Sequence, residues 1–115
     1  MLNNLAWLYH QANDERGLAL AQRAHELAPA SPEIMDTYGW LMFNTGKTEQ
    51  GLSLLEKAAS LAPHNPDILF HVASAMYRSG EVDQARSRLN SILQTYQTFS
   101  LRKDAEALLV ELDDH

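Results

Sequence analysis

The residues of this chain best suited to chemistry are its histidines and carboxylates. There are 15 Asp and Glu residues and five histidines, namely His10, His25, His64, His71 and His115. No two histidines have the three- or four-residue spacing of a metal-binding pair on a helix. The carboxylates lie on expected solvent faces and near expected helix starts, where the positive helix end favours them. Since phosphate-loop, zinc-protease and serine-hydrolase motifs are also missing, we predict no catalytic residue, no cofactor, no metal site and no enzymatic activity.

Composition restricts the class of partner. The 115 residues suffice for one domain, expected over 1–115, with a modest core. The formal net charge is −6, and an acidic surface repels phosphate backbones, so nucleic acid is not expected as a partner. No apolar run approaches the roughly 20 residues of a membrane span. The chain has no cysteine, which excludes disulfides and thiol chemistry.

Identical residues recur at a distance of 34 positions. Seven pairs share this spacing: Gly17 and Gly51, Ala24 and Ala58, Leu27 and Leu61, Ala28 and Ala62, Pro29 and Pro63, Pro32 and Pro66, and Gly46 and Gly80. A fixed period of this length is typical of stacked helical repeats, in which each unit covers its neighbour's apolar face.

The central unit predicts two helices joined by a tight turn. The first begins at Ser31-Pro32, a good N-cap followed by a proline that the first helical position tolerates. It ends near Gly46, which can adopt a left-handed conformation. The second helix runs from about Thr48 to Leu61. Asn65-Pro66 repeats the start signal for the next unit.

Glycine also recurs inside the predicted helices, at Gly17, Gly39 and Gly51. Glycine in a helix interior costs about 1 kcal/mol relative to alanine. The periodic placement favours positions where two helices approach closely, and that approach can offset the cost.

These patterns resemble the tetratricopeptide repeat family. The central unit has Met35, Tyr38, Gly39 and Met42, then Gly51, Leu55, Ala58 and Pro63, at the spacing of the family motif. The third unit has Leu69, Val72, Ala73 and Met76, then Ala85, Leu89 and Ile92. The first unit departs from the pattern, because its turn from His10 to Glu15 is one residue short and its first helical turn is missing.

The resemblance implies an all-α, right-handed superhelical array of helix–turn–helix repeats. Repeat 1, N-terminally incomplete, covers 1–30, repeat 2 covers 31–64 and repeat 3 covers 65–98. A capping helix follows over 100–113, with Ser100 as its cap and one apolar face formed by Leu101, Ala105, Leu108, Leu109 and Leu112. We expect the chain to be the C-terminal part of a longer repeat protein.

The resemblance also implies a concave, peptide-binding groove lined by the first helix of each repeat. The predicted groove residues are Asn3, Asn4, Trp7, His10 and Gln11 in repeat 1, Asp36, Thr37, Trp40, Phe43 and Asn44 in repeat 2, and Phe70, His71, Ser74, Tyr77 and Arg78 in repeat 3. Their aromatic side chains predict an exposed aromatic strip with a polar rim. The alternative is that these aromatics pack against the last helix or between units.

One family subtype is not expected. Family members that clamp a C-terminal carboxylate use Lys, Asn, Asn, Lys and Arg, and the matching positions here hold Asn3, Trp7, Thr37, Asp67 and His71. None of the five matches. The expected ligand is therefore more apolar than an acidic tail, either an extended peptide or an amphipathic helix.

The predicted function is a non-catalytic scaffold or adaptor for a protein or peptide partner. The amino-acid sequence of the repeats is also similar to the C-terminal repeats of bacterial lipoproteins associated with exosortase and exopolysaccharide systems. This resemblance would imply a location in the periplasm or cell envelope. Without it, the cytoplasm is expected. Two alternatives stay open: an accessory segment of a polymer-export or glycosyl-transfer enzyme, and self-assembly as a weak homodimer through the uncapped N-terminal face.

Overall fold

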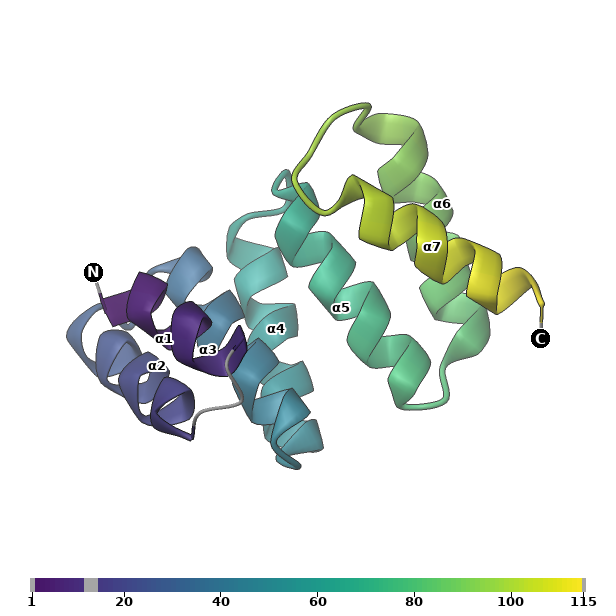
Figure 1. Cartoon of the computed structure of the whole chain (residues 1–115). Helices are drawn as coiled ribbons and strands as arrows, with labels where there is room; N and C mark the ends of the chain where they lie inside the picture. The colour runs from purple at the N-terminus through teal and green to yellow at the C-terminus, as the bar shows by residue number, and fades with distance from the viewer. Residues whose placement is uncertain (1, 12–14, 115) are drawn as a thin grey trace. The chain divides into compact units, whose positions relative to one another are not determined.

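The computed structural model describes the backbone of residues 2–11 and 15–114, and the side chains of residues 6–10 and 15–114. The regular structure within these ranges is entirely α-helical (Figure 1). The helices are α1 (Leu2–Gln11), α2 (Arg16–Leu27), α3 (Pro32–Asn44), α4 (Thr48–Leu61), α5 (Pro66–Arg78), α6 (Val82–Thr95) and α7 (Arg102–Asp113). The expectation of an all-α array of helix pairs with a terminal helix is confirmed.

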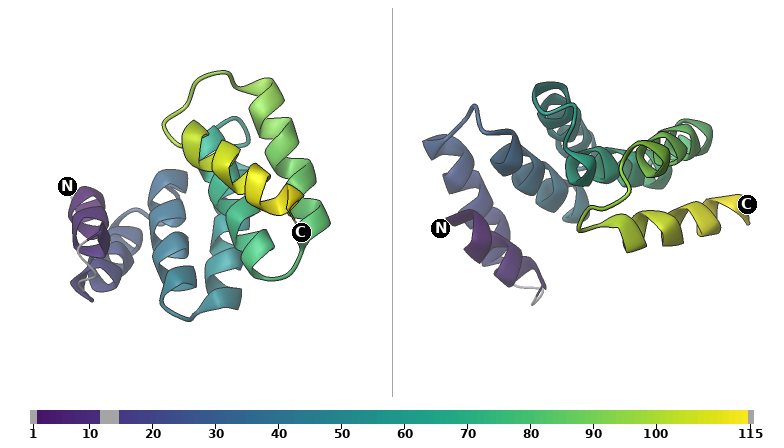
Figure 2. Two further views of the ribbon diagram at one scale, coloured as in Figure 1. Left: turned by 45° about the vertical axis from the view of Figure 1, so that its right-hand side comes forward. Right: turned by 90° about the horizontal axis from the view of Figure 1, so that it is seen from above.

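The helices form two compact units. Unit 1 covers Met1–Leu61 with α1 to α4, and unit 2 covers Ala62–His115 with α5 to α7. Within the units α1 packs against α2, α3 against α4 and α5 against α6. The two helices of each pair run antiparallel, as the views of Figure 2 show.

The predicted start and end of α3 are confirmed at atomic detail. The Ser31 hydroxyl accepts a hydrogen bond from the Ile34 nitrogen at 3.4 Å, and Pro32 occupies the first helical position. Gly46 adopts a φ of 100°, and the Lys47 nitrogen donates to the Met42 carbonyl at 2.9 Å. This closing pattern uses a carbonyl that would otherwise lack a partner at the helix end.

The same start and end recur in α5. The Asn65 side chain accepts from the Asp67 and Ile68 nitrogens at 3.1 and 3.3 Å. Gly80 has a φ of 95°, and the Glu81 nitrogen donates to the Met76 carbonyl at 2.9 Å. The recurrence explains the spacing of these polar, proline and glycine positions, because each repeat needs the same local hydrogen bonds to begin and end its first helix.

Close helix packing explains the glycines inside the helices, as predicted. A Cβ added at Gly51 would lie 2.6 Å from the Phe43 nitrogen and 2.7 Å from the Gly39 carbonyl oxygen. A Cβ at Gly17 would lie 2.9 Å from the Ala6 carbonyl oxygen. Real Cβ atoms do not approach backbone this closely, so α1–α2 and α3–α4 can pack as they do only with glycine at these positions. The corresponding positions of α5 and α6 hold the fully buried Ala73 and Ala85.

The core of unit 1 includes a small buried cluster. Ala6 from α1, Ala21 from α2 and Leu41 from α3 form its centre. Larger side chains pack around these three: Trp7, Leu18, Leu20, Tyr38 and Trp40. The two alanines let α1 and α2 approach closely, Leu41 fills the space beside them, and the larger residues cover the contact.

Helix α7 packs against α6 and buries Ala105 and Leu112 completely. Asp67, in the first turn of α5, holds the segment before α7: its carboxylate accepts from the Ser100 hydroxyl at 2.6 Å and from the Leu101 nitrogen at 3.1 Å. The expectation that Ser100 caps α7 is therefore wrong. The N-cap residue is Leu101, which has no side-chain hydrogen bond to the helix, because the Ser100 hydroxyl is used by Asp67.

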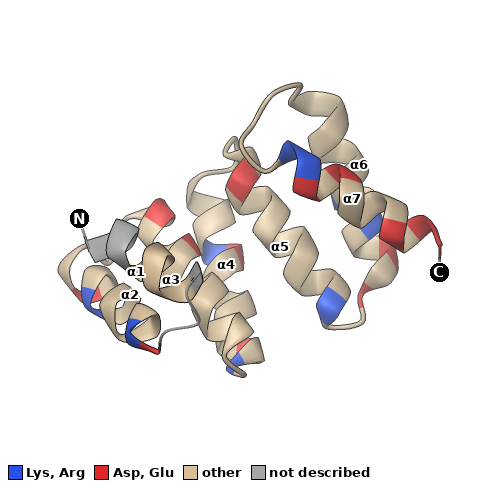
Figure 3. Cartoon of the chain, in the orientation of Figure 1, with Lys and Arg blue, Asp and Glu red and all other residues tan. Residues whose placement is uncertain are grey.

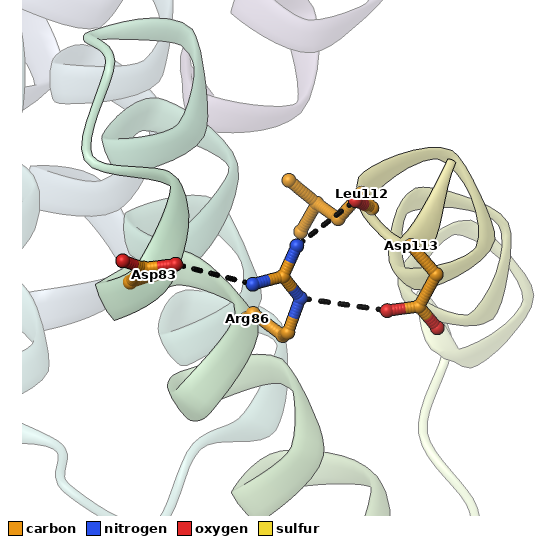
Figure 4. Close-up of polar contacts among 4 residues, drawn as sticks. All are labelled: Asp83, Arg86, Leu112 and Asp113. Carbon is orange, nitrogen blue, oxygen red and sulfur yellow. Dashed lines mark hydrogen bonds and ion pairs between the residues drawn. The ribbon is translucent and has the colours of Figure 1, made fainter. Parts of the chain in front are cut away.

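The other end of α7 is held by Arg86 of α6 (Figure 4). Its Nη2 donates to the Leu112 carbonyl oxygen at 3.0 Å, and its Nε lies 3.4 Å from the Asp113 carboxylate. Its Nη1 pairs with Asp83 of the same helix at 3.2 Å. The guanidinium thus supplies both a donor and a positive charge to the negative end of α7.

Candidate functional site

In unit 1, predicted groove residues of α1 and α3 come together around an indole. The Trp7 Nε1 donates to the Thr37 hydroxyl oxygen at 2.9 Å, and that hydroxyl donates to the Glu33 carbonyl oxygen at 3.1 Å. Thr37 is buried. The ring of His10 lies edge-on to Trp7, with 6.1 Å between the ring centroids. These contacts fix the orientation of an indole that is itself only half-buried.

Trp40 is the second half-buried indole of unit 1, and it packs against the same cluster as Trp7. Asn44, one turn further along α3, donates from its Nδ2 to the Trp40 carbonyl oxygen at 2.7 Å. We call Trp7, His10, Trp40 and Asn44 the tryptophan surface. Each of the four is partly accessible to solvent, and together they combine flat apolar area with polar groups.

The expected aromatic strip is not continuously exposed. Phe43 is only 3% exposed and Phe70 only 7%, and Asp36 and His71 are buried as well. For Phe43 the cause is the close approach of α4, whose Gly51 lies against the Phe43 backbone. Tyr77 is half-buried and Arg78 is exposed at the end of α5. The side chains of Asn3, Asn4 and Gln11 lie outside the described residues, although their backbone belongs to α1.

In unit 2 an open hollow of about 600 Å³ lies between α5 and α7. Phe70 and Ser74 of α5 line one side. The other side is formed by α7 and the residue after it: Asp104, Ala107, Leu108, Val110, Glu111 and Asp114. We call this the α5–α7 hollow. The sequence predicts Phe70 and Ser74 on the first helix of repeat 3, where the structure places them. It does not predict that residues of α7 line the same hollow. The signal for α7 in the sequence is the run of three apolar residues Leu108, Leu109 and Val110. Consecutive residues point to different sides of a helix, so this run extends beyond the one face that packs on a neighbour.

Charge is unevenly distributed over α7. Figure 3 shows basic residues at its start and acidic residues from there to its end. Arg102 pairs with Glu106 at 3.5 Å and also donates to the Tyr96 carbonyl oxygen at 2.6 Å. The lining of the α5–α7 hollow contains three carboxylates and no Lys or Arg.

Within the described part of the chain, no group of three or more His, Asp or Glu side chains is arranged to hold a metal ion. None of the described helices has the length and apolar character needed to cross a membrane.

Solved structures with the same fold come from different proteins. Two structures of the type III secretion translocator chaperone SycD from Yersinia enterocolitica match with TM-scores of 0.77 and 0.80 at 18% and 19% identity. They cover 97% of this chain, which corresponds to 81% and 89% of those chains. A mutant of the O-GlcNAc transferase from Thermobaculum terrenum matches with a TM-score of 0.85 at 20% identity, over 96% of this chain but only 21% of that one.

Sequence comparison provides the assignment to a family. No curated protein matches the chain. A family model described as tetratricopeptide repeat matches residues 45–112, which is more than half of the chain. That match covers α4 to α7 almost completely, and the start and end signals of α5 repeat those of α3 one period earlier. The chain therefore belongs to the tetratricopeptide repeat family.

Proposed function

We propose that this chain is a non-catalytic interaction module that binds a peptide or an amphipathic helix of a partner protein through the first helices of its repeats. The observation that carries the proposal is the tryptophan surface of unit 1. Tryptophan offers a large apolar area and one polar group, and such residues dominate the binding energy of many protein interfaces.

The tryptophan surface is preorganised for binding. Trp7 is held by its hydrogen bond to Thr37, and Trp40 is held by packing against the cluster centred on Leu41. A side chain that is already fixed loses little conformational entropy when a partner arrives. The contact energy is then available for affinity, which favours a binding role over a purely structural one for these half-buried rings.

The comparisons support a protein partner by analogy. SycD is described as a translocator chaperone, so its function concerns other proteins. The absence of a carboxylate clamp at Asn3, Trp7, Thr37, Asp67 and His71 supports a ligand other than an acidic C-terminal tail.

The experiment is a selection of peptides from a random display library on the wild-type protein, followed by affinity measurements on variants. Trp40→Ala should weaken the selected peptides about tenfold or more, as loss of a central anchor does. Tyr9→Ala is the matched control, because Tyr9 is another half-buried aromatic of unit 1 and contacts Arg16. Unchanged affinity in Trp40→Ala, with the fold verified by circular dichroism, would contradict the proposal.

A second candidate is an accessory repeat segment attached to an enzyme. The favouring observation is the match of 96% of this chain to about a fifth of an O-GlcNAc transferase. The full-length gene distinguishes the two candidates. A catalytic domain in the same reading frame favours the accessory segment of an enzyme. A lipoprotein signal with further repeats favours the scaffold in the bacterial envelope, which the sequence resemblance suggests.

Self-association through α1 is a further part of the proposal. Leu8 of α1 is one of the large hydrophobic side chains that are more than half exposed. Sedimentation velocity over a range of concentrations should show a weak dimer that Leu8→Glu removes. A strictly monomeric wild-type protein would exclude it.

A further inference from the structure

We infer that the α5–α7 hollow binds a basic and apolar segment of the partner, in which a Lys or Arg neighbours a large apolar side chain. This inference rests on the proposed function, because Phe70 and Ser74 of the hollow are among the predicted groove residues. It goes further in two ways, by assigning a binding role to α7 and by stating the charge of the ligand.

The first observation is the apolar base of the hollow. Phe70 contributes to one wall, and Ala107, Leu108 and Val110 contribute apolar area from α7. Val110 is 63% exposed, although it is a large β-branched residue in a helix that already buries Ala105 and Leu112 against the unit. The apolar part of α7 is thus wider than its packing on α6 requires, and the excess lines the hollow.

The second observation is a set of carboxylates at the same place. Asp104, Glu111 and Asp114 line the hollow, and among the described residues none of these side chains has an ion pair or a hydrogen bond. Glu111 and Asp114 lie at the C-terminal end of α7, where the helix dipole is also negative and disfavours carboxylates. Arg86 compensates Asp113 and the Leu112 carbonyl but makes no contact with Glu111 or Asp114.

The third observation is independent of the charges. Ser74 lines the hollow, is only 9% exposed, and its hydroxyl makes no hydrogen bond among the described residues. The hydroxyl is not a buried atom without a partner, so it is accessible from the hollow. A polar group of a bound segment would form a hydrogen bond with it in place of solvent.

Together these features specify the ligand by complementarity. A Lys or Arg fits because it would neutralise Glu111 and Asp114 and interact favourably with the end of α7. A neighbouring Leu, Phe or Trp fits because it would cover Leu108 and the exposed Val110. An acidic segment is excluded by repulsion from three carboxylates, which agrees with the missing carboxylate clamp.

The test uses the peptides selected on the wild-type protein from the random display library. The inference expects them to be enriched in Lys or Arg next to a large apolar residue. The triple variant Asp104→Asn, Glu111→Gln, Asp114→Asn should weaken them about tenfold, because three partly exposed ion pairs are lost. The triple variant Glu15→Gln, Glu26→Gln, Glu56→Gln makes the same change in net charge at exposed sites outside the hollow and should leave affinity unchanged.

A thermal unfolding measurement separates binding from a structural role. Neutralising Glu111 and Asp114 removes repulsion at the end of α7, whereas neutralising Asp104 removes a favourable charge in its first turn. The free triple variant should therefore have about the stability of the wild type while it binds more weakly. Selected peptides without basic enrichment, or with equal affinity for both triple variants, would overturn the inference. If the affinity of such peptides still falls in Trp40→Ala, the proposed function stands and only this inference fails. A library that yields no binder overturns both.

Discussion

At the scale of single residues, the absence of a Cβ controls how closely the first two helix pairs pack. Gly51 faces the backbone of α3 at Gly39 and Phe43, and Gly17 faces the backbone of α1. Backbone atoms cannot move aside as a flexible side chain can. Each of these glycines therefore carries a constraint that its intrinsic helix preference does not reveal.

We expect Gly51→Ala to destabilise the protein although alanine is the better helix former. The new Cβ would meet the Phe43 nitrogen at 2.6 Å, so α3 and α4 must move apart. Overpacking of this kind typically costs about 1–3 kcal/mol, which exceeds the gain of about 1 kcal/mol in helix preference. Urea denaturation measures the sign directly.

Ser53→Ala is the control for Gly51→Ala. Ser53 lies on the exposed face of the same helix, so this change tests helix preference without a clash. Its stability should be equal to that of the wild type or slightly higher. Equal stability of Gly51→Ala and the wild type would show that the α3–α4 contact relaxes without cost.

At the scale of elements, α7 depends on two polar contacts as well as on its apolar face. Asp67 holds the segment before it and Arg86 holds its end (Figure 4). Arginine suits the second role because its planar group can donate in several directions at once. Lysine has the same charge but cannot reproduce that geometry.

Arg86→Lys should therefore loosen the last turn of α7 without unfolding unit 2. We expect amide hydrogen exchange in that turn to accelerate about threefold, the effect of losing a partly exposed polar contact. Arg88→Lys on the same helix is the matched control, because Arg88 is exposed. Equal exchange in the two variants would assign the docking of α7 to its apolar face alone.

The helices could be predicted because their signals are local. Ser31, Pro32 and Gly46 act within a few residues of where they stand, so α3 and α4 have the expected bounds. The role of Ser100 cannot be predicted in this way, because its hydrogen-bond partner, Asp67, is 33 residues away. The burial of Phe43 and the α5–α7 hollow could not be predicted for the same reason: both depend on how closely separate helices pack, which residue spacing alone does not determine.

At the scale of the whole molecule, the chain has the fold of a protein-interaction scaffold, built as two compact units. In repeat proteins each element is stabilised mainly by its neighbours, so stability is distributed along the chain. Each unit has its own buried residues, such as Leu41 in unit 1 and Leu89 in unit 2.

Core truncation should consequently act locally. Leu89→Ala removes a fully buried side chain of α6 and should cost about 2–5 kcal/mol. Hydrogen exchange should accelerate most in α6 and α7 and least in α1 and α2. Leu41→Ala is the mirror variant and should show the reverse order. Uniform acceleration in both variants would mean that the chain unfolds as one cooperative block.

The contact of Asp67 with Ser100 and Leu101 spans one repeat length, since the partners are 33 and 34 positions apart. The start of α7 is therefore attached where a following repeat would begin. Duplication of residues 65–98 in place would supply a second aspartate at the correct distance to hold the same segment. An array of this kind can therefore gain or lose whole repeats while α7 stays attached to the repeat before it.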